Sequence, residues 1–192
     1  MRRDLSFEHN YEISLTDEIP GSPGRIEQFY YPGASVVGSA GGTAGGIWVT
    51  VIPQSGSPWM GYFAQQYESP PAISAIASSP NAEMFCVISS GLGYIVKAQD
   101  PRNWAKVECF PILDFRSIAS ARILLFSDFT KLVAYDVRGK LWRTQDICWD
   151  KLKIQEITNE RITGTGWNAP KSREMSFEVD LKTGNILRSV KT

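Results

Sequence analysis

Short apolar runs separated by turn residues recur along the chain, and their length limits the fold more than any other feature. Each run holds three to six residues and is rich in Val, Ile, Tyr, Phe or Trp, the residue types enriched in strands. A helix needs about 10–12 residues with a 3.6-residue period, and only the short stretches 62–67 and 114–121 approach that pattern. The sequence therefore predicts a mainly β protein, with strands at 47–52, 84–88, 94–96, 123–126, 131–135, 152–157 and 177–181.

These strand-like segments repeat. They begin at Ile47, Met84, Ile123 and Ile162, so that successive starts lie 37, 39 and 39 residues apart. Such a period is typical of a β-meander that buries its face only against its neighbours. Meanders of this kind stack face to face or close into a ring of blades. We expect antiparallel meanders that form a β-sandwich or half-open barrel, and a small four-bladed propeller-like fold is the alternative.

Aspartates at the ends of the strands have a structural explanation. Asp136 and Asp180 each follow an apolar strand and precede a glycine, which is Gly139 or Gly184. An Asp at the entrance of a turn accepts backbone N–H bonds, and glycine supplies the positive φ that a hairpin bulge requires. These residues therefore predict hairpin turns and not chemistry.

One of these turns carries a resemblance. In Val133–Trp142 a strand ends in Asp, a glycine turn follows and a Trp begins the return strand, which resembles a blade of the β-propeller families. The segment Leu124–Gly184 is similar to uncharacterised bacterial proteins that carry a Trp-Asp turn before a Gly-Thr-Gly-Trp segment, here Trp149-Asp150 and Gly164–Trp167. This resemblance covers about a third of the chain. It implies a β-rich fold with meander units and no activity.

A single β domain is expected, because the 192 residues only slightly exceed an average domain of about 150 residues. Within it we expect a polar N-terminal segment at 1–31, a Gly-rich connector at 32–46 and a meander core at 47–192. The glycine tract at 38–46 lacks the Gly-Lys-Ser/Thr ending of a phosphate-binding loop, and a strand follows it. We interpret it as a flexible or close-packed connector; a loop that covers a ligand is the alternative.

The charge balance and the cysteines limit the kinds of partner and the cell compartment that we expect. The 20 basic and 20 acidic side chains cancel, whereas a nucleic-acid partner usually demands a basic face. No window approaches the roughly 18 apolar residues of a membrane span, and no apolar stretch of a signal peptide follows the first residues. Cys86, Cys109 and Cys148 form no CxxC pair, so we expect buried structural thiols. The expectation is a cytoplasmic protein without nucleic-acid or membrane partners.

The sequence offers no constellation for catalysis or metal binding. His9 is the only histidine, and neither a Gly-x-Ser-x-Gly nor a Ser-x-x-Lys motif occurs. The aspartates lack the D-x-D-x-D-G spacing of a calcium loop, and most acidic residues fall at turns or among basic neighbours. We therefore predict no catalytic residue, no cofactor and no metal. A hydrolase that uses two carboxylates is kept as an alternative.

Trp59, Tyr62, Phe63 and Tyr67 form the candidate binding patch. They follow the turn-forming segment 54–58, and aromatic side chains beside glycine and proline favour contact with a protein or a sugar. Packing over the core is the other interpretation. The leading hypothesis is a non-enzymatic protein–protein interaction domain that meets a partner protein or a second copy of itself. A carbohydrate or small-molecule binding module is the alternative, beside the carboxylate-dependent hydrolase.

Overall fold

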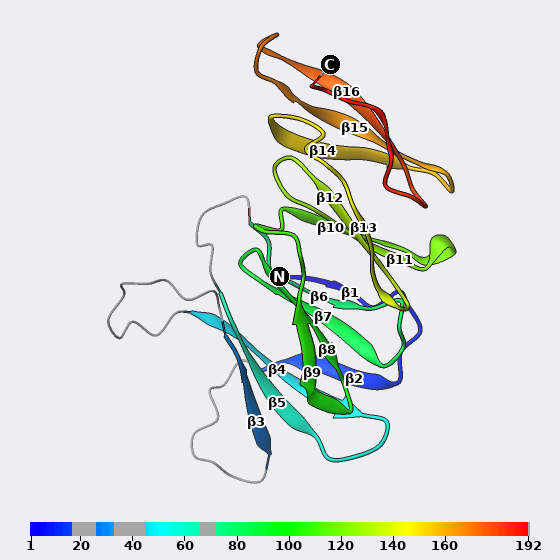
Figure 1. The fold of residues 1–192 in the computed structure, drawn as a ribbon. Helices are drawn as coiled ribbons and strands as arrows, with labels where there is room; N and C mark the ends of the chain where they lie inside the picture. Colours follow the sequence, from blue (N-terminus) through cyan, green and yellow to red (C-terminus); the bar gives the residue numbers. More distant parts are fainter. Residues whose placement is uncertain (17–25, 33–44, 66–71, 192) are drawn as a thin grey trace.

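A computed structural model describes residues 1–16, 26–32, 45–65 and 72–191. These residues form strands for most of their length, and the one helical element among them is a short 3₁₀ turn, η1 (Ala119–Ala121). The strands make four sheets (Figure 1). The prediction of a mainly β protein is confirmed, and each predicted strand coincides with or overlaps an observed one.

The first two sheets hold the amino-terminal half of the chain. The first sheet has the strand order β2-β4-β5-β3, with β2 (Tyr11–Leu15), β4 (Gly46–Pro53), β5 (Trp59–Ala64) and β3 (Glu27–Tyr31). The second sheet has the order β1-β6-β7-β8-β9, with β1 (Arg2–Asp4), β6 (Ala75–Ser78), β7 (Met84–Ser89), β8 (Leu92–Lys97) and β9 (Asp100–Lys106). The pairs β3·β5 and β1·β6 are parallel, whereas the other pairs of these sheets are antiparallel.

The third and fourth sheets are antiparallel meanders whose strands follow chain order. The third contains β10 (Asp114–Ile118), β11 (Ile123–Ser127), β12 (Leu132–Asp136) and β13 (Gly139–Arg143). The fourth contains β14 (Asp150–Ile157), β15 (Arg161–Asn168), β16 (Arg173–Asp180) and β17 (Ile186–Arg188). The repeat near 39 residues is therefore the length of one sheet. Its starts at Met84, Ile123 and Ile162 fall in β7, β11 and β15, each of which is the second strand in the antiparallel run of its sheet.

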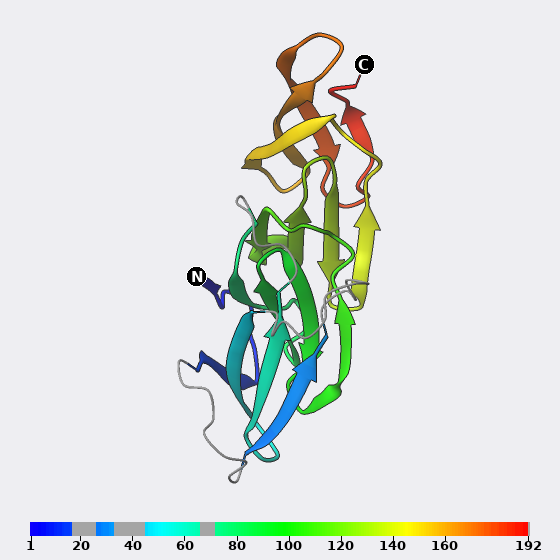
Figure 2. The same cartoon turned by 90° about the vertical axis from the view of Figure 1, so that its left-hand side faces the viewer.

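The four sheets stack face to face in one open column. One buried cluster lies between the first and second sheets, another between the second and third, and another between the third and fourth. Figures 1 and 2 place the first and fourth sheets at opposite ends, and no buried cluster of the described residues joins them. The stacking is that of a β-sandwich extended to four layers, as predicted. The sheets close neither a barrel nor the ring of a four-bladed propeller.

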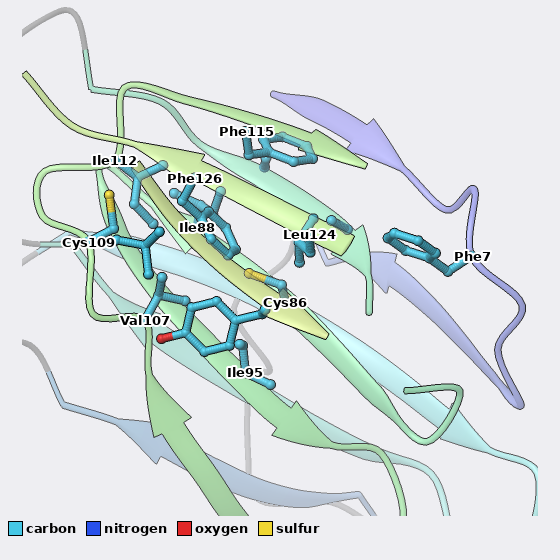
Figure 3. Close-up of a cluster of buried hydrophobic side chains, with 14 residues drawn as sticks. Phe7, Cys86, Ile88, Ile95, Val107, Cys109, Ile112, Phe115, Leu124 and Phe126 are labelled. Atoms are coloured by element: carbon cyan, nitrogen blue, oxygen red, sulfur yellow. The ribbon is translucent and has the colours of Figure 1, made fainter. Parts of the chain in front are cut away.

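The position of the second sheet between the first and third sheets explains the uninterrupted apolar run Met84–Ile88 in β7. In β7 the side chains of Phe85 and Val87 pack against the first sheet, whereas those of Cys86 and Ile88 pack against the third. A strand that is covered on both faces needs an apolar residue at every position. Figure 3 shows Cys86 and Ile88 meeting Leu124 and Phe126 in the cluster between the second and third sheets.

All three cysteines are buried and free, as expected of structural thiols. Burial raises the pKa of each thiol, and that of Cys148 reaches about 11. Desolvation is the dominant cause, because it disfavours the charged thiolate.

The aspartate turns form as predicted. Asp136 accepts the backbone N–H of Arg138 at 2.7 Å, and Asp180 accepts those of Lys182 and Thr183 at 3.1 and 2.8 Å. Gly139 and Gly184 have φ of 118° and 71°. The Thr183 hydroxyl, which donates to Asp180 at 2.7 Å, and then these backbone bonds hold the pKa of Asp180 below its usual value. Turn geometry accounts for these residues without any chemistry.

The segment expected to be polar and outside the meander core contributes strands and buried side chains. The polar segment 1–31 contains β1, β2 and β3, and its Tyr11, Ile13 and Tyr31 are buried between the first and second sheets. Two stretches approach helical periodicity: the described part of 62–67 holds the end of β5, and 114–121 holds β10 followed by the 3₁₀ turn η1. Cross-strand pairing overrides weak local preference in β5 and β10. No helix of the described residues is long and apolar enough to cross a membrane.

Candidate functional site

The predicted patch is divided between the two faces of β5. Trp59 and Phe63 point into the cluster below the first sheet and are 3% and 0% exposed. Tyr62 lies on the opposite face, because successive side chains of a strand alternate between faces. Tyr67 lies outside the described residues. The structure therefore brings Trp59 and Phe63 together in the core and separates both from Tyr62.

Packing accounts for the two inward aromatic residues. The indole Nε1 of Trp59 donates to the carbonyl of Ala98 at 2.8 Å. The ring of Phe63 stacks on that of Tyr31, with centroids 4.3 Å apart and planes 5° apart. A buried indole whose N–H is satisfied and a parallel ring pair both stabilise a core.

Tyr62 belongs to a different group, which we call the outer aromatic cluster: Tyr30, Trp48 and Tyr62. The register pairs Tyr62 with Trp48 on β4 and with Tyr30 on β3. The ring centroids lie 5.1 Å apart for Trp48 and Tyr62, 5.6 Å for Trp48 and Tyr30, and 6.0 Å for Tyr30 and Tyr62. The three strands thus place one aromatic cluster on the outer face of the first sheet, which no other sheet of the described residues covers.

Glycine at the end of the connector makes room for this cluster. A Cβ at Gly46 would lie 2.6 Å from Cζ of Tyr62 and 2.6 Å from the carbonyl oxygen of Phe63. Only a residue without a side chain allows the Tyr62 ring to cross β4 there. For this end of the Gly-rich connector, close packing is the better interpretation; residues 33–44 lie outside the described part.

Exposed apolar side chains gather around the same sheet. Tyr30 is 65% exposed and Ile52, on the same outer face, is 44% exposed. Ile26 just before β3 is also exposed, as is Leu15 at the end of β2, although the pairing of Leu15 with Val49 places it on the inner side of the sheet. Large apolar side chains that cluster on a surface mark an interaction site more often than isolated ones do.

The outer face of the fourth sheet has a different character. Its strands present mainly charged and hydroxyl side chains: Lys153, Glu156, Arg161, Thr163, Thr165, Ser176, Glu178 and Arg188. Arg161 pairs with Glu178, and Arg188 donates to the Ser176 hydroxyl at 3.4 Å. Trp167 also lies on this face, with the Lys151 ammonium 5.3 Å from its ring centroid. One end of the stack is therefore solvated and the other is aromatic.

A small hollow opens where the β4–β5 turn meets β9, and we call it the hairpin hollow. It has a volume of about 310 Å³ and is lined in part by Glu27, Phe29, Trp59, Asp100 and Arg102. The Arg102 guanidinium lies 3.8 Å from Glu27 and 6.0 Å from the centre of the Phe29 ring. Polar and aromatic groups converge here, as in small-molecule sites.

The only histidine, His9, contacts residues close to it in the chain. The Nδ1 of His9 lies 2.8 Å from the carbonyl oxygen of Phe7, and its ring packs against Tyr11. Within the described ranges, no three His, Cys, Asp or Glu side chains are grouped so that they could hold a metal ion.

Comparison with known proteins adds no identity to this geometry. No protein-family model matches the chain, and no curated protein matches it.

Proposed function

We propose that this chain is a non-enzymatic association domain that pairs with a second copy of itself through the outer face of the first sheet. The contrast between the two ends of the stack carries the proposal. Stacked repeats need terminal units with a polar outer face to stay soluble. The fourth sheet has such a face, whereas the first sheet ends in Tyr30, Trp48, Tyr62 and the exposed Ile52.

The ring geometry favours a protein surface over a flat sugar. A sugar ring stacks on the open, flat face of an aromatic ring. Here the planes of Tyr30, Trp48 and Tyr62 are inclined to one another by 51° to 79°. Such tilted rings leave ridges and grooves into which the side chains of a protein partner interdigitate.

A second copy fits this face because its own first sheet would offer the same kind of apolar surface that already packs between neighbouring sheets of the chain. The adjoining layer boundary, between the first and second sheets, is already built of aromatic and aliphatic side chains such as Tyr31, Phe63 and Phe85. Two first sheets packed face to face would add one more boundary of this kind, related by a two-fold axis. The net charge of zero leaves no overall repulsion between the copies.

The mass in solution tests the proposal. We expect light scattering to give a dimer that dissociates on dilution. Tyr30→Glu adds a charge to the cluster and is expected to give a monomer. Ser176→Glu adds the same charge to the outer face of the fourth sheet and is expected to leave the dimer intact. A wild-type monomer at every concentration, or equal masses for the two variants, would contradict the proposal; circular dichroism checks that both variants fold.

The hairpin hollow supports a second candidate function, the binding of a small polyhydroxylated molecule. Phe29 and Trp59 contribute aromatic side chains to its lining, and Glu27, Asp100 and Arg102 contribute polar groups. Glu27 and Asp100 are also the carboxylates on which a hydrolase would depend. Ligand-detected NMR against a panel of sugars tests binding, with Arg102→Gln as the variant that should weaken it. Turnover of nitrophenyl glycosides that Glu27→Gln abolishes would favour the hydrolase.

A further inference from the structure

A larger hollow lies between the third and fourth sheets, where their first strands β10 and β14 face each other. Its volume is about 590 Å³, which is within the usual range of small-molecule sites. Leu113, just before β10, and Phe129, between β11 and β12, line it on the side of the third sheet, and Leu152 and Ile154 of β14 line it from the fourth. The hollow therefore has an apolar floor, on a surface separate from the outer face of the first sheet.

Guanidinium groups lie beside this hollow. Arg116 lines it together with Asp114, whereas the ammonium groups of Lys151 and Lys153 lie near Trp167 and Glu174 on the outer face of the fourth sheet. Asp114 already accepts Arg116 at 2.9 Å and Arg2 at 3.1 Å, so one carboxylate faces two guanidinium groups. Both arginine side chains are more than 40% exposed. An anion can reach them without breaking the core.

The backbone at the lip of the hollow departs from a regular strand. The pairing of β14 with β15 is irregular between Asp150 and Lys153. Lys151 has φ of 56°, a left-handed conformation that costs a non-glycine residue free energy. Asp150 holds this turn by accepting the Lys151 N–H at 2.7 Å. Irregular pairing and backbone strain are concentrated at functional sites.

Two glycines of the Gly-Thr-Gly-Trp segment shape the same strand. A Cβ at Gly164 would lie 2.0 Å from the carbonyl oxygen of Lys153, and a Cβ at Gly166 would lie 2.5 Å from Cβ of Cys148. The chain just before β14 and the strand itself therefore fold closely over the inner face of β15. This close approach is one reason why the segment requires its glycines.

We propose that this hollow binds a small amphipathic carboxylate, with its apolar chain on the floor and its carboxylate beside Arg116 at the mouth. Burial of alkyl carbons against Phe129, Leu152 and Ile154 supplies affinity. Arg116 and Arg2, which share the one carboxylate of Asp114, select the head group, because a charge-assisted bond to a guanidinium is stronger than a neutral one. The site is independent of self-association.

Three eight-carbon probes that differ only in the head group provide the test. Octanoate is expected to saturate in a calorimetric titration and to shift the ¹⁵N amide signals of 113–116 and 150–154. Octylammonium is expected to bind about tenfold more weakly or worse, and octanol is expected to fall between them. Equal affinity for the two charged probes, no saturation, or shifts elsewhere would overturn the proposal.

Variants separate the head-group contact from the hollow itself. Arg116→Gln is expected to weaken octanoate about tenfold while leaving octanol unchanged. Lys182→Gln, which removes a charge from a distant turn, is expected to have no effect. Ile154→Trp fills the floor and is expected to abolish binding of all three probes. Circular dichroism checks that each variant folds. Full octanoate affinity in folded Arg116→Gln and Ile154→Trp would also overturn the proposal.

Discussion

Gly46 lies beneath the ring of Tyr62, where a Cβ would approach Cζ of that ring to 2.6 Å. Gly46→Ala should therefore displace the ring and strain β4 against the Phe63 carbonyl. We expect a loss of about 1–3 kcal/mol in the free energy of unfolding, the usual cost of overpacking. Urea unfolding measures the loss, and the fluorescence of neighbouring Trp48 reports the moved ring. Unchanged stability and fluorescence would show that the contact imposes no constraint.

A similar contact joins the third and fourth sheets at Gly184. A Cβ there would lie 2.6 Å from Cδ2 of Trp142, and the Trp142 indole donates to the Leu181 carbonyl at 3.0 Å. Gly184 also has φ of 71°, so that Gly184→Ala should destabilise by about 2 kcal/mol or more. In a double-mutant cycle with Trp142→Phe, part of this loss should disappear, because the smaller ring leaves space. If the losses in the free energy of unfolding of the two single variants were strictly additive, the whole effect of Gly184→Ala would come from its backbone conformation and not from the contact with Trp142.

The buried thiols should be unreactive in the folded protein. Desolvation raises the pKa of Cys148 to about 11 and raises those of Cys86 and Cys109 as well. All three are therefore protonated at pH 8, and the thiolate is the reactive form. We expect mass spectrometry to find no rapid iodoacetamide labelling of the native chain and full labelling after denaturation in guanidinium. Rapid labelling of the native chain at any one of them would contradict the packing described for that residue.

The ion pairs of Asp146 should make the free energy of unfolding depend on pH in the acid range. Lys131 and Lys191, at 3.0 and 3.1 Å, lower the pKa of Asp146 to about 2. Because the folded pKa lies below the unfolded one, near 4, this stabilisation is present above pH 4 and is lost as the pH falls to 2.

Asp146→Asn measures that contribution. Since Asp146 is 41% exposed, solvent screening should limit the loss at pH 7 to below about 1 kcal/mol. The difference from wild type should shrink towards pH 2 in urea titrations. Glu160→Gln, which removes an exposed carboxylate outside this network, is the control. A difference that stays constant with pH would mean that the ion pairs are not its source.

The sequence predicts the strands that are dictated locally and misses those that depend on distant partners. Met84–Ile88 and Ile123–Phe126 are apolar throughout because sheets cover both of their faces, and that signal needs no partner to be recognised. Tyr11–Leu15 alternates apolar and polar residues over only five positions. It becomes a strand by pairing with β4, whose paired residues lie more than thirty positions further along the chain.

The same limit applies to the candidate site. The alternation of β5 alone separates Trp59 and Phe63 from Tyr62, once the segment is recognised as a strand and not as a short helical stretch. Trp48 and Tyr30 could not be added, because the register that places them beside Tyr62 joins three strands from different parts of the chain. No local pattern contains that information.

Self-association through the outer aromatic cluster is the central claim, and a dilution series followed by NMR tests it most directly. Amide signals of a ¹⁵N-labelled sample would be recorded from millimolar to micromolar concentration. We predict that the signals that change with concentration belong to β3, β4 and β5, and that those of β15 and β16 stay fixed. A spectrum that does not change with concentration while light scattering gives a monomer, or changes confined to the fourth sheet, would contradict the claim.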